Sequence, residues 1–346
     1  MHCVSTIFMS TVLFFSVPIL GTLLPKPLLK LYTPHSILEH KHLYTPLPVG
    51  NRTRYATATS AAWFHGHYLA LLNLYGQQIQ IYFFDEHTQS VQLIQEIADP
   101  RNTHLHMPEH IAISPDETLL ILGNSNPPSM NIYTITPDHR VHPQPLLSIP
   151  HNGLVHNARF SPDGNYCACA CFDKKHAISI YALDRDYGGI KLRQTFCGSN
   201  NSLLRTKAIN FTKDGKFAII AYALAARDSV KRPYESMLVV REFDQKQGIL
   251  GTIVCTVRDA FFSEDICLSP DETELFVTDQ AYDQLLIYPF NACSGIISAH
   301  CTRYCNPEAQ LSFPHGISIS RDGKYMAVSN YGDDSCTIYA LYSSSH

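Results

Sequence analysis

Five ionisable side chains recur at one position of a repeated phrase, each seven residues before an aspartate. They are Glu109, His156, Lys207, Glu264 and His315. An imidazole or carboxylate held beside a second such group can act as the base that activates water, and a cation can stabilise an oxyanion. We therefore predict that His315 or Glu264 activates water. Lys207 or His156 would then meet the oxyanion. The alternative is that the five charges only neutralise one another in a water-filled channel.

A second polar position lies eight residues after each of these aspartates, or after His65 in the first unit. It holds Asn73, Asn124, Cys171, Tyr222, Asp279 and Asn330. Asparagine or aspartate at a strand end is typical of turns, because its side chain bonds nearby backbone. The alternative is that Asn73, Asn124 and Asn330, together with Glu109, bind a substrate. No cofactor is required by the pattern, although Asp279 and Glu264 together could hold a divalent cation.

Both positions belong to a phrase that occurs five times, as in "GISISRDGKYMAVSN" from Gly316, and once in degenerate form from Ala61. The aspartates at 116, 163, 214, 271 and 322 are 47, 51, 57 and 51 residues apart. Each copy reads as two strands around a turn, a third strand marked by Ile-Tyr and a less regular fourth strand. We predict an all-β fold, a β-propeller of six four-stranded blades, with seven as the alternative.

The last copy ends after its third strand, so a segment before the first copy is expected to close the ring. We predict a single propeller domain over residues 25–346, with the closing strand within 25–50 and the blade repeats over 51–346. Closure in this way leaves no open sheet edge. Because the first strand of a blade is innermost, both polar positions should meet around the channel mouth on one face. Such a concavity is the default place for a ligand.

The stretch 167–171 has cysteine at every second position. In an extended chain the outer two would be about 13 Å apart, whereas a zinc ion needs its sulfurs within about 4 Å of one another. The three cysteines therefore cannot all bind one ion, although two could with a ligand from elsewhere. Cys167 and Cys169 align with apolar residues of the other copies, so we expect them in the core. Cys171 falls at the polar position, and its role is open.

Composition excludes one class of partner and leaves the compartment open. The 346 residues include 26 basic and 30 acidic ones, with no run of Lys and Arg, so nucleic acid is not an expected partner. Residues 7–24 carry no charge and reach the length of a membrane span, but no Lys or Arg precedes them. Residues 1–24 are thus a signal-like or anchor segment, or an unstructured start. The protein is exported or membrane-anchored in the first case and cytoplasmic otherwise, and membrane association would come only through residues 7–24.

The last copy, "PHGISISRDGKYMAVSNYGDDSCTIYAL", and the copy "EHIAISPDETLLILGNSN" from Glu109 resemble the repeats of the lactonase-type β-propeller family, which includes 6-phosphogluconolactonase-like proteins. The likeness covers about residues 55–346. It implies a propeller fold and, as the activity to expect, hydrolysis of a lactone. The resemblance points to His315 and Asn330 in the last copy, and to Glu109 and His156 at matching positions.

Two functions fit these observations. The first is hydrolysis of a small lactone or similar cyclic ester at the channel mouth. The second is a non-catalytic scaffold that binds a protein or other partner on its face. Geometry separates them, because catalysis needs Glu264, His315 and a cationic donor around one small site, whereas a binding platform needs a broad exposed apolar patch.

Overall fold

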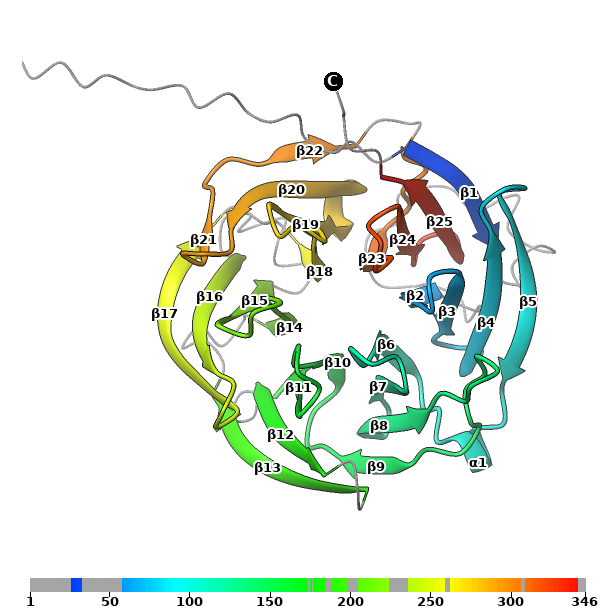
Figure 1. Cartoon of the computed structure of the whole chain (residues 1–346), viewed down its shortest axis with the longest axis horizontal. Coiled ribbons are helices and arrows are strands. Elements are labelled where there is room, and N and C mark those ends of the chain that lie inside the picture. Colours follow the sequence, from blue (N-terminus) through cyan, green and yellow to red (C-terminus); the bar gives the residue numbers. More distant parts are fainter. Residues whose placement is uncertain are drawn as a thin grey trace, which may run out of the picture.

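The computed structural model describes residues 26–32, 58–173, 175, 177–184, 188–197, 205–223, 236–258, 262–305 and 309–341. In these ranges the strands form six sheets arranged in a ring around a central axis (Figure 1). The prediction of an all-β, six-bladed propeller is therefore confirmed. Among the described residues no helix has the length and hydropathy that a bilayer crossing requires. Residues 1–24 lie outside the described ranges.

The first three blades each contain four antiparallel strands that follow one another in the chain. Blade 1 consists of β2 (Ala58–Phe64), β3 (Tyr68–Asn73), β4 (Gln78–Asp85) and β5 (Ser90–Ile97). Blade 2 consists of β6 (Pro108–Ile113), β7 (Leu119–Ser125), β8 (Pro128–Thr134) and β9 (Leu147–Pro150). Blade 3 consists of β10 (Val155–Phe160), β11 (Tyr166–Cys171), β12 (Ile178–Asp184) and β13 (Gly189–Phe196). The short helix α1 (Pro100–Thr103) precedes blade 2.

The remaining blades repeat this order with two variations. Blade 4 consists of β14 (Arg205–Phe211), β15 (Phe217–Ala223), β16 (Met237–Asp244) and β17 (Ile249–Val257). Blade 5 consists of β18 (Ser263–Leu268), β19 (Glu274–Asp279), β20 (Gln284–Asn291) and two short outer pieces, β21 (Ile296–Ile297) and β22 (Thr302–Tyr304), with the 3-10 helix η2 (Gln280–Tyr282) after β19. Blade 6 consists of β23 (Pro314–Ile319), β24 (Tyr325–Asn330), β25 (Ser335–Ala340) and, from the other end of the chain, β1 (Lys26–Tyr32).

The ring is closed by β1, as predicted. This strand runs antiparallel to β25, with Lys30 opposite Thr337, and so gives the last blade its fourth strand. An ion pair of 2.5 Å between Lys30 Nζ and Asp333 Oδ2 fastens the junction. In the described ranges the closing strand lies at the beginning of the segment 25–50, and residues 33–50 lie outside those ranges.

The Ser-Pro-Asp-Gly-like phrase forms a tight turn between the first and second strand of a blade. In blade 2 the Ser114 hydroxyl donates to Asp116 Oδ1 at 2.6 Å and accepts from the Leu119 amide at 2.9 Å. Glu117 has a left-handed φ of 58° there, and glycine takes the same conformation at 164, 215 and 323. The same serine–aspartate bond occurs at Ser161–Asp163, Ser269–Asp271 and Ser320–Asp322. The phrase thus sets where each first strand ends.

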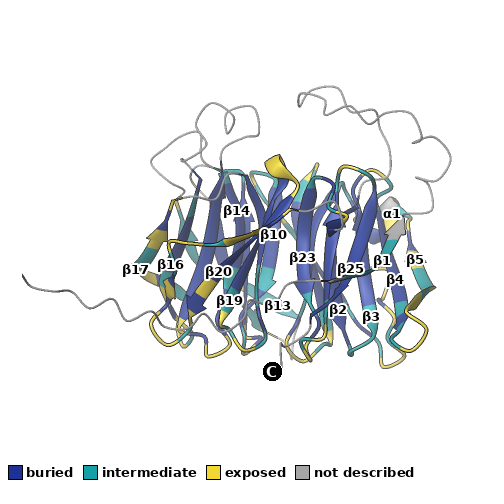
Figure 2. Cartoon of the chain, turned by 90° about the horizontal axis from the view of Figure 1, so that it is seen from above, coloured by how far each residue is buried: buried dark blue, intermediate teal, exposed yellow. Residues whose placement is uncertain are grey.

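The apolar side chains of the strands pack between neighbouring blades. Each of the six core clusters joins two adjacent blades, and blade 6 is joined to blade 1 in this way. Figure 2 shows the inner strands buried along most of their length. Cys167 and Cys169 are fully buried between blades 2 and 3, which confirms their predicted core position. This packing fixes the innermost strands, which position the site.

Candidate functional site

The innermost strands carry β-bulges at the five ionisable positions. The register with the second strand jumps from Pro108 to His110, from Val155 to Asn157 and from Thr206 to Ala208. Equivalent jumps in β18 and β23 skip Glu264 and His315. A bulge leaves the extra residue out of the ladder and redirects its side chain. The ionisable side chains are thus freed to contact those of other blades.

Glu264 lies at the centre of the resulting cluster. Its carboxylate, 2% exposed, accepts from Lys207 Nζ at 2.7 and 2.9 Å and contacts His156 Nε2 at 2.8 Å. His315 Nε2 is 3.6 Å from the same carboxylate. Burial alone would raise the pKa of Glu264, but the charges of Lys207 and His156 hold it well below its usual range. Glu264 is therefore an ionised anchor for its neighbours and a poor acceptor for a proton from water.

His156 contacts two hydrogen-bond acceptors through its ring nitrogens. Its Nδ1 lies 2.8 Å from the backbone oxygen of Lys207, and its Nε2 contacts the Glu264 carboxylate. Both partners only accept hydrogen bonds, so both ring nitrogens must carry hydrogen. Phe172 stacks on the imidazole with ring centroids 5.0 Å apart. The Lys207 ammonium also lies over rings, 4.9 Å from that of Phe172 and 4.7 Å from that of Phe262.

His315 and Glu109 complete the cluster, and their environment favours the uncharged form of each. Burial lowers the pKa of His315 to about 4, so its ring is neutral at neutral pH. Burial also raises the pKa of Glu109. Ligand atoms of Glu109, His156 and His315 all lie within 4.8 Å of one another. The structure thus brings all five ionisable side chains to one place, where two cations share a single ionised carboxylate beside a neutral histidine.

The polar residues at the strand ends organise loops. Asn124, fully buried, accepts from the amide of His106 at 3.0 Å and donates to the backbone oxygen of His104 at 3.0 Å. The corresponding side chains make similar contacts: Asn73 with the Gly76 amide, Asp279 with the Phe262 amide and Gln284, and Asn330 with the Ser312 amide, Ser335 and Thr337. These contacts are typical of turn chemistry. Substrate binding by Asn73, Asn124, Asn330 and Glu109 stays a prediction.

The cation that Asp279 and Glu264 were expected to share also stays a prediction. Asp279 uses both carboxylate oxygens within its own blade, and Glu264 uses both on Lys207 and His156. Two groups in the described ranges have the geometry to hold a metal ion: Glu109 with His156 and His315, and His151 with Cys169 and Cys171. In the first group both nitrogens of His156 already have partners. In the second group the ligand atoms contact one another, the Tyr181 hydroxyl and the backbone oxygen of Ser179.

A second buried network, which the sequence analysis missed, lies beside the cluster. Asp265 is 1% exposed and accepts from His110 Nε2 at 3.2 Å, from Asn157 Nδ2 at 3.0 Å and from Arg159 at 3.2 Å. It also accepts from the amide of Ile317, so one carboxylate connects the innermost strands of blades 2, 3, 5 and 6. In the sequence, the residue directly after the ionisable position is polar in three of the copies: His110, Asn157 and Asp265.

Protonation in this network is fixed by geometry. His110 Nδ1 accepts from the Ala158 amide at 3.4 Å, so Nε2 carries the hydrogen that faces Asp265. Burial lowers the pKa of His110 to about 4, in agreement with a neutral ring. Burial opposes ionisation of Asp265, but Arg159 and His110 hold its pKa well below its usual range. Asp265 is therefore a buried charge that depends on its partners.

Comparison with known proteins bears on the fold. No family model and no curated protein sequence matches the chain. A candidate 6-phosphogluconolactonase from Bacteroides uniformis has a similar structure, with a TM-score of 0.60 and 16% identity over 82% of this chain and 80% of that one. A periplasmic gluconolactonase from Pseudomonas aeruginosa has a TM-score of 0.52 and 15% sequence identity, over 82% of this chain and 89% of that one. Hydrazine synthase of Kuenenia stuttgartiensis has a TM-score of 0.55 and 14% sequence identity, over 88% of this chain and 98% of that one.

These likenesses concern architecture and not chemistry. Hydrazine synthase and gluconolactonase share the fold with this chain, and a fold of this kind does not select a reaction. The resemblance inferred from the repeats is nevertheless confirmed at the level of the fold. The chain is a six-bladed β-propeller with the architecture of the lactonase-type structures.

Proposed function

We propose that the protein hydrolyses a small lactone or similar cyclic ester at the channel mouth. The observation that carries this proposal is the pairing of one ionised, buried Glu264 with two cations, Lys207 and His156, next to the neutral His315. Positive charge in excess of the carboxylate suits an oxyanion, and a neutral imidazole suits proton transfer from water. The fold shared with lactonase-type structures agrees with this reaction class.

The residues divide the chemistry between them. His315 accepts a proton as water attacks the lactone carbonyl carbon, and the carbonyl oxygen becomes an oxyanion. Lys207 donates to that oxyanion with the N–H that it does not give to Glu264, and His156 adds a second positive charge. The ring C–O bond then breaks, and the imidazolium of His315 returns its proton to the leaving alkoxide. The product is the open hydroxy acid.

The test is hydrolysis of simple and phosphorylated sugar lactones by the purified protein, compared with His315→Gln. We expect the variant to lose about 100-fold or more in kcat, since a positioned base contributes about 10²–10⁴-fold. In the wild type, kcat/KM should rise as the pH is raised through about 4, where His315 becomes neutral, and should be level near pH 7. His142→Gln, an exposed histidine outside the cluster, is the matched control. Absence of hydrolysis across the panel, or equal rates in the wild type and His315→Gln, would refute the proposal.

The alternative of a binding scaffold finds less support in the surface. The exposed large apolar side chains of the described ranges are distributed singly or in pairs over blades 1 to 5: Tyr75, Leu93, Leu146, Leu192, Ile253, Tyr282 and Ile296. Scattered apolar residues of this kind are ordinary on protein surfaces, whereas interaction faces present contiguous patches. A small-molecule substrate is therefore the partner that we propose.

A further inference from the structure

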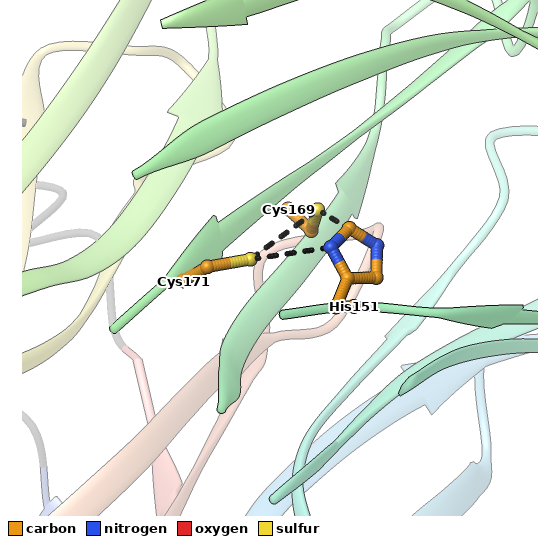
Figure 3. Close-up of side chains that lie close together, drawn as sticks. All are labelled: His151, Cys169 and Cys171. Atoms are coloured by element: carbon orange, nitrogen blue, oxygen red, sulfur yellow. Dashed lines mark hydrogen bonds between the residues drawn. The ribbon is translucent and has the colours of Figure 1, made fainter. Parts of the chain in front are cut away.

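A second cluster of reactive side chains lies away from the five ionisable residues, between blades 2 and 3. Cys169 and Cys171 point to the same side of β11, and their sulfurs are 3.7 Å apart. His151, which follows β9, presents the edge of its ring to both: Nε2 is 3.6 Å from Cys169 Sγ and Nδ1 is 3.7 Å from Cys171 Sγ. Figure 3 shows the imidazole directed toward the two sulfurs.

The distance between the two sulfurs matches that of a tetrahedral zinc site. Zinc–sulfur bonds of about 2.3 Å at a tetrahedral angle place two sulfurs roughly 3.8 Å apart, and a zinc–nitrogen bond of about 2.0 Å places nitrogen about 3.5 Å from each sulfur. One ligand atom from each of the three residues can be chosen so that all lie within 4.8 Å of one another. In the structure the two sulfurs contact different nitrogens of the ring, so the imidazole has to turn for Nδ1 to face both of them.

The chemistry of the donors selects the ion. Two thiolates and one imidazole are soft or borderline ligands, which favour zinc over magnesium or calcium. Two thiolates also balance the charge of a divalent ion, which matters because the cysteines are 0% and 2% exposed. His151 is only partly buried, so water can reach the fourth position.

Tyr181 supplies the outer contact that metal-binding histidines require. Its hydroxyl lies 3.3 Å from His151 Nε2, where it can accept the N–H of that nitrogen and leave Nδ1 for the ion. A disulfide between the two cysteines fits less well. Residues two apart on a strand have Cα atoms about 6.6 Å apart, at the upper end of the range for disulfides. Both cysteines also keep ladder partners on β10, Ala158 for Cys169 and, beyond the bulge, Val155 for Cys171.

We propose that His151 Nδ1, Cys169 Sγ and Cys171 Sγ form a zinc site with water as the fourth ligand, fastening the β9–β10 connection to β11. It is independent of the proposed hydrolysis. Cys167, two residues earlier on the same face of β11, contributes no ligand. It therefore provides a matched control.

The test is titration of the full-length, metal-free protein with Co²⁺ and then Zn²⁺, followed by absorption spectroscopy. The wild type and Cys167→Ser should bind one Co²⁺ at this site, with thiolate-to-cobalt charge-transfer bands and the intense visible bands of four-coordinate cobalt, and Zn²⁺ should displace it. Cys169→Ser, Cys171→Ser and His151→Ala should weaken binding by more than about 100-fold, since changes to outer contacts alone cost roughly 10–100-fold. Tyr181→Phe should fall in that smaller range.

His151→Ala protects the test against misfolding, because it alters a partly buried loop residue and leaves β11 intact. Its thermal unfolding without metal should equal that of the metal-free wild type. The exposed thiols of Cys197, Cys293 and Cys305 remain in every variant, so the difference between variants isolates the cluster. A wild type without the charge-transfer bands, or bands that persist in Cys169→Ser and His151→Ala alike, would overturn the proposal.

Discussion

Replacing Glu264 with glutamine is expected to slow hydrolysis strongly and to destabilise the propeller at the same time. Loss of the carboxylate leaves Lys207 and His156 as adjacent buried cations without a counter-charge. Removing one partner of a buried pair typically costs about 3–5 kcal/mol. Urea unfolding should therefore show a lower midpoint, and the rate should fall by about 100-fold or more, because Lys207 loses the carboxylate that positions it as the oxyanion donor.

The double variant Glu264→Gln/Lys207→Met separates these two effects. Removing the second charge should recover part of the lost stability, so the two substitutions should be strongly non-additive in unfolding experiments. Activity should not recover, because the oxyanion then lacks Lys207. Asp138→Asn, in an exposed loop, is the control and should change neither property. Equal stability of Glu264→Gln and the wild type would contradict the ion-pair account.

Replacing Asp265 with alanine should produce the largest loss of stability in the protein. The substitution strands Arg159, whose side chain is 13% exposed, and removes acceptors from His110 in blade 2 and Asn157 in blade 3. An uncompensated buried charge costs about 3–5 kcal/mol, and each buried donor left without a partner adds about 1–3 kcal/mol. We expect a markedly lower urea midpoint, or no folded protein at all.

Adding Arg159→Met to Asp265→Ala should recover stability if the network acts through charge. Asp265→Asn is a milder substitution that keeps the shape of the side chain. Its stability can be measured by calorimetry or urea unfolding. The matched control is Asp271→Asn, a turn aspartate with the same type of carboxylate at the opposite end of the hairpin from Asp265. An Asp265→Asn variant no less stable than Asp271→Asn would show that the network contributes nothing.

The fold could be predicted from the sequence because local turn chemistry recurs with the blades. Ser114 and Asp116 make the same contacts as their equivalents in other copies, so one phrase marks each hairpin. The missing strand of blade 6 could also be inferred, since the last copy stops after three strands. Its bounds, Lys26–Tyr32, could not, because this segment does not carry the phrase.

The site could be predicted in part. Alignment of the copies identified Glu109, His156, Lys207, Glu264 and His315, and the structure brings them together. It could not identify Asp265, because neighbouring residues of a regular strand point to opposite faces. The bulge between Ser263 and Ile266 takes both Glu264 and Asp265 out of the ladder, and both then reach other blades.

His151 illustrates a second limit. It lies in a connection between blades, where the repeat imposes no pattern, and only the three-dimensional structure shows that it faces Cys169 and Cys171. The spacing of the cysteines shows that two of them would need a ligand from elsewhere to bind an ion, but nothing in the sequence indicates which residue provides it.

The central claim, that the charged cluster at the channel mouth is a hydrolytic site, is tested most directly by a crystal structure with a lactam analogue of a substrate lactone. A lactam has the carbonyl of the lactone but resists ring opening. We expect its carbonyl oxygen within hydrogen-bonding distance of Lys207 Nζ and its carbonyl carbon next to His315. A lactam bound elsewhere, or a cluster that remains closed around Glu264 at saturating lactam, would contradict the claim.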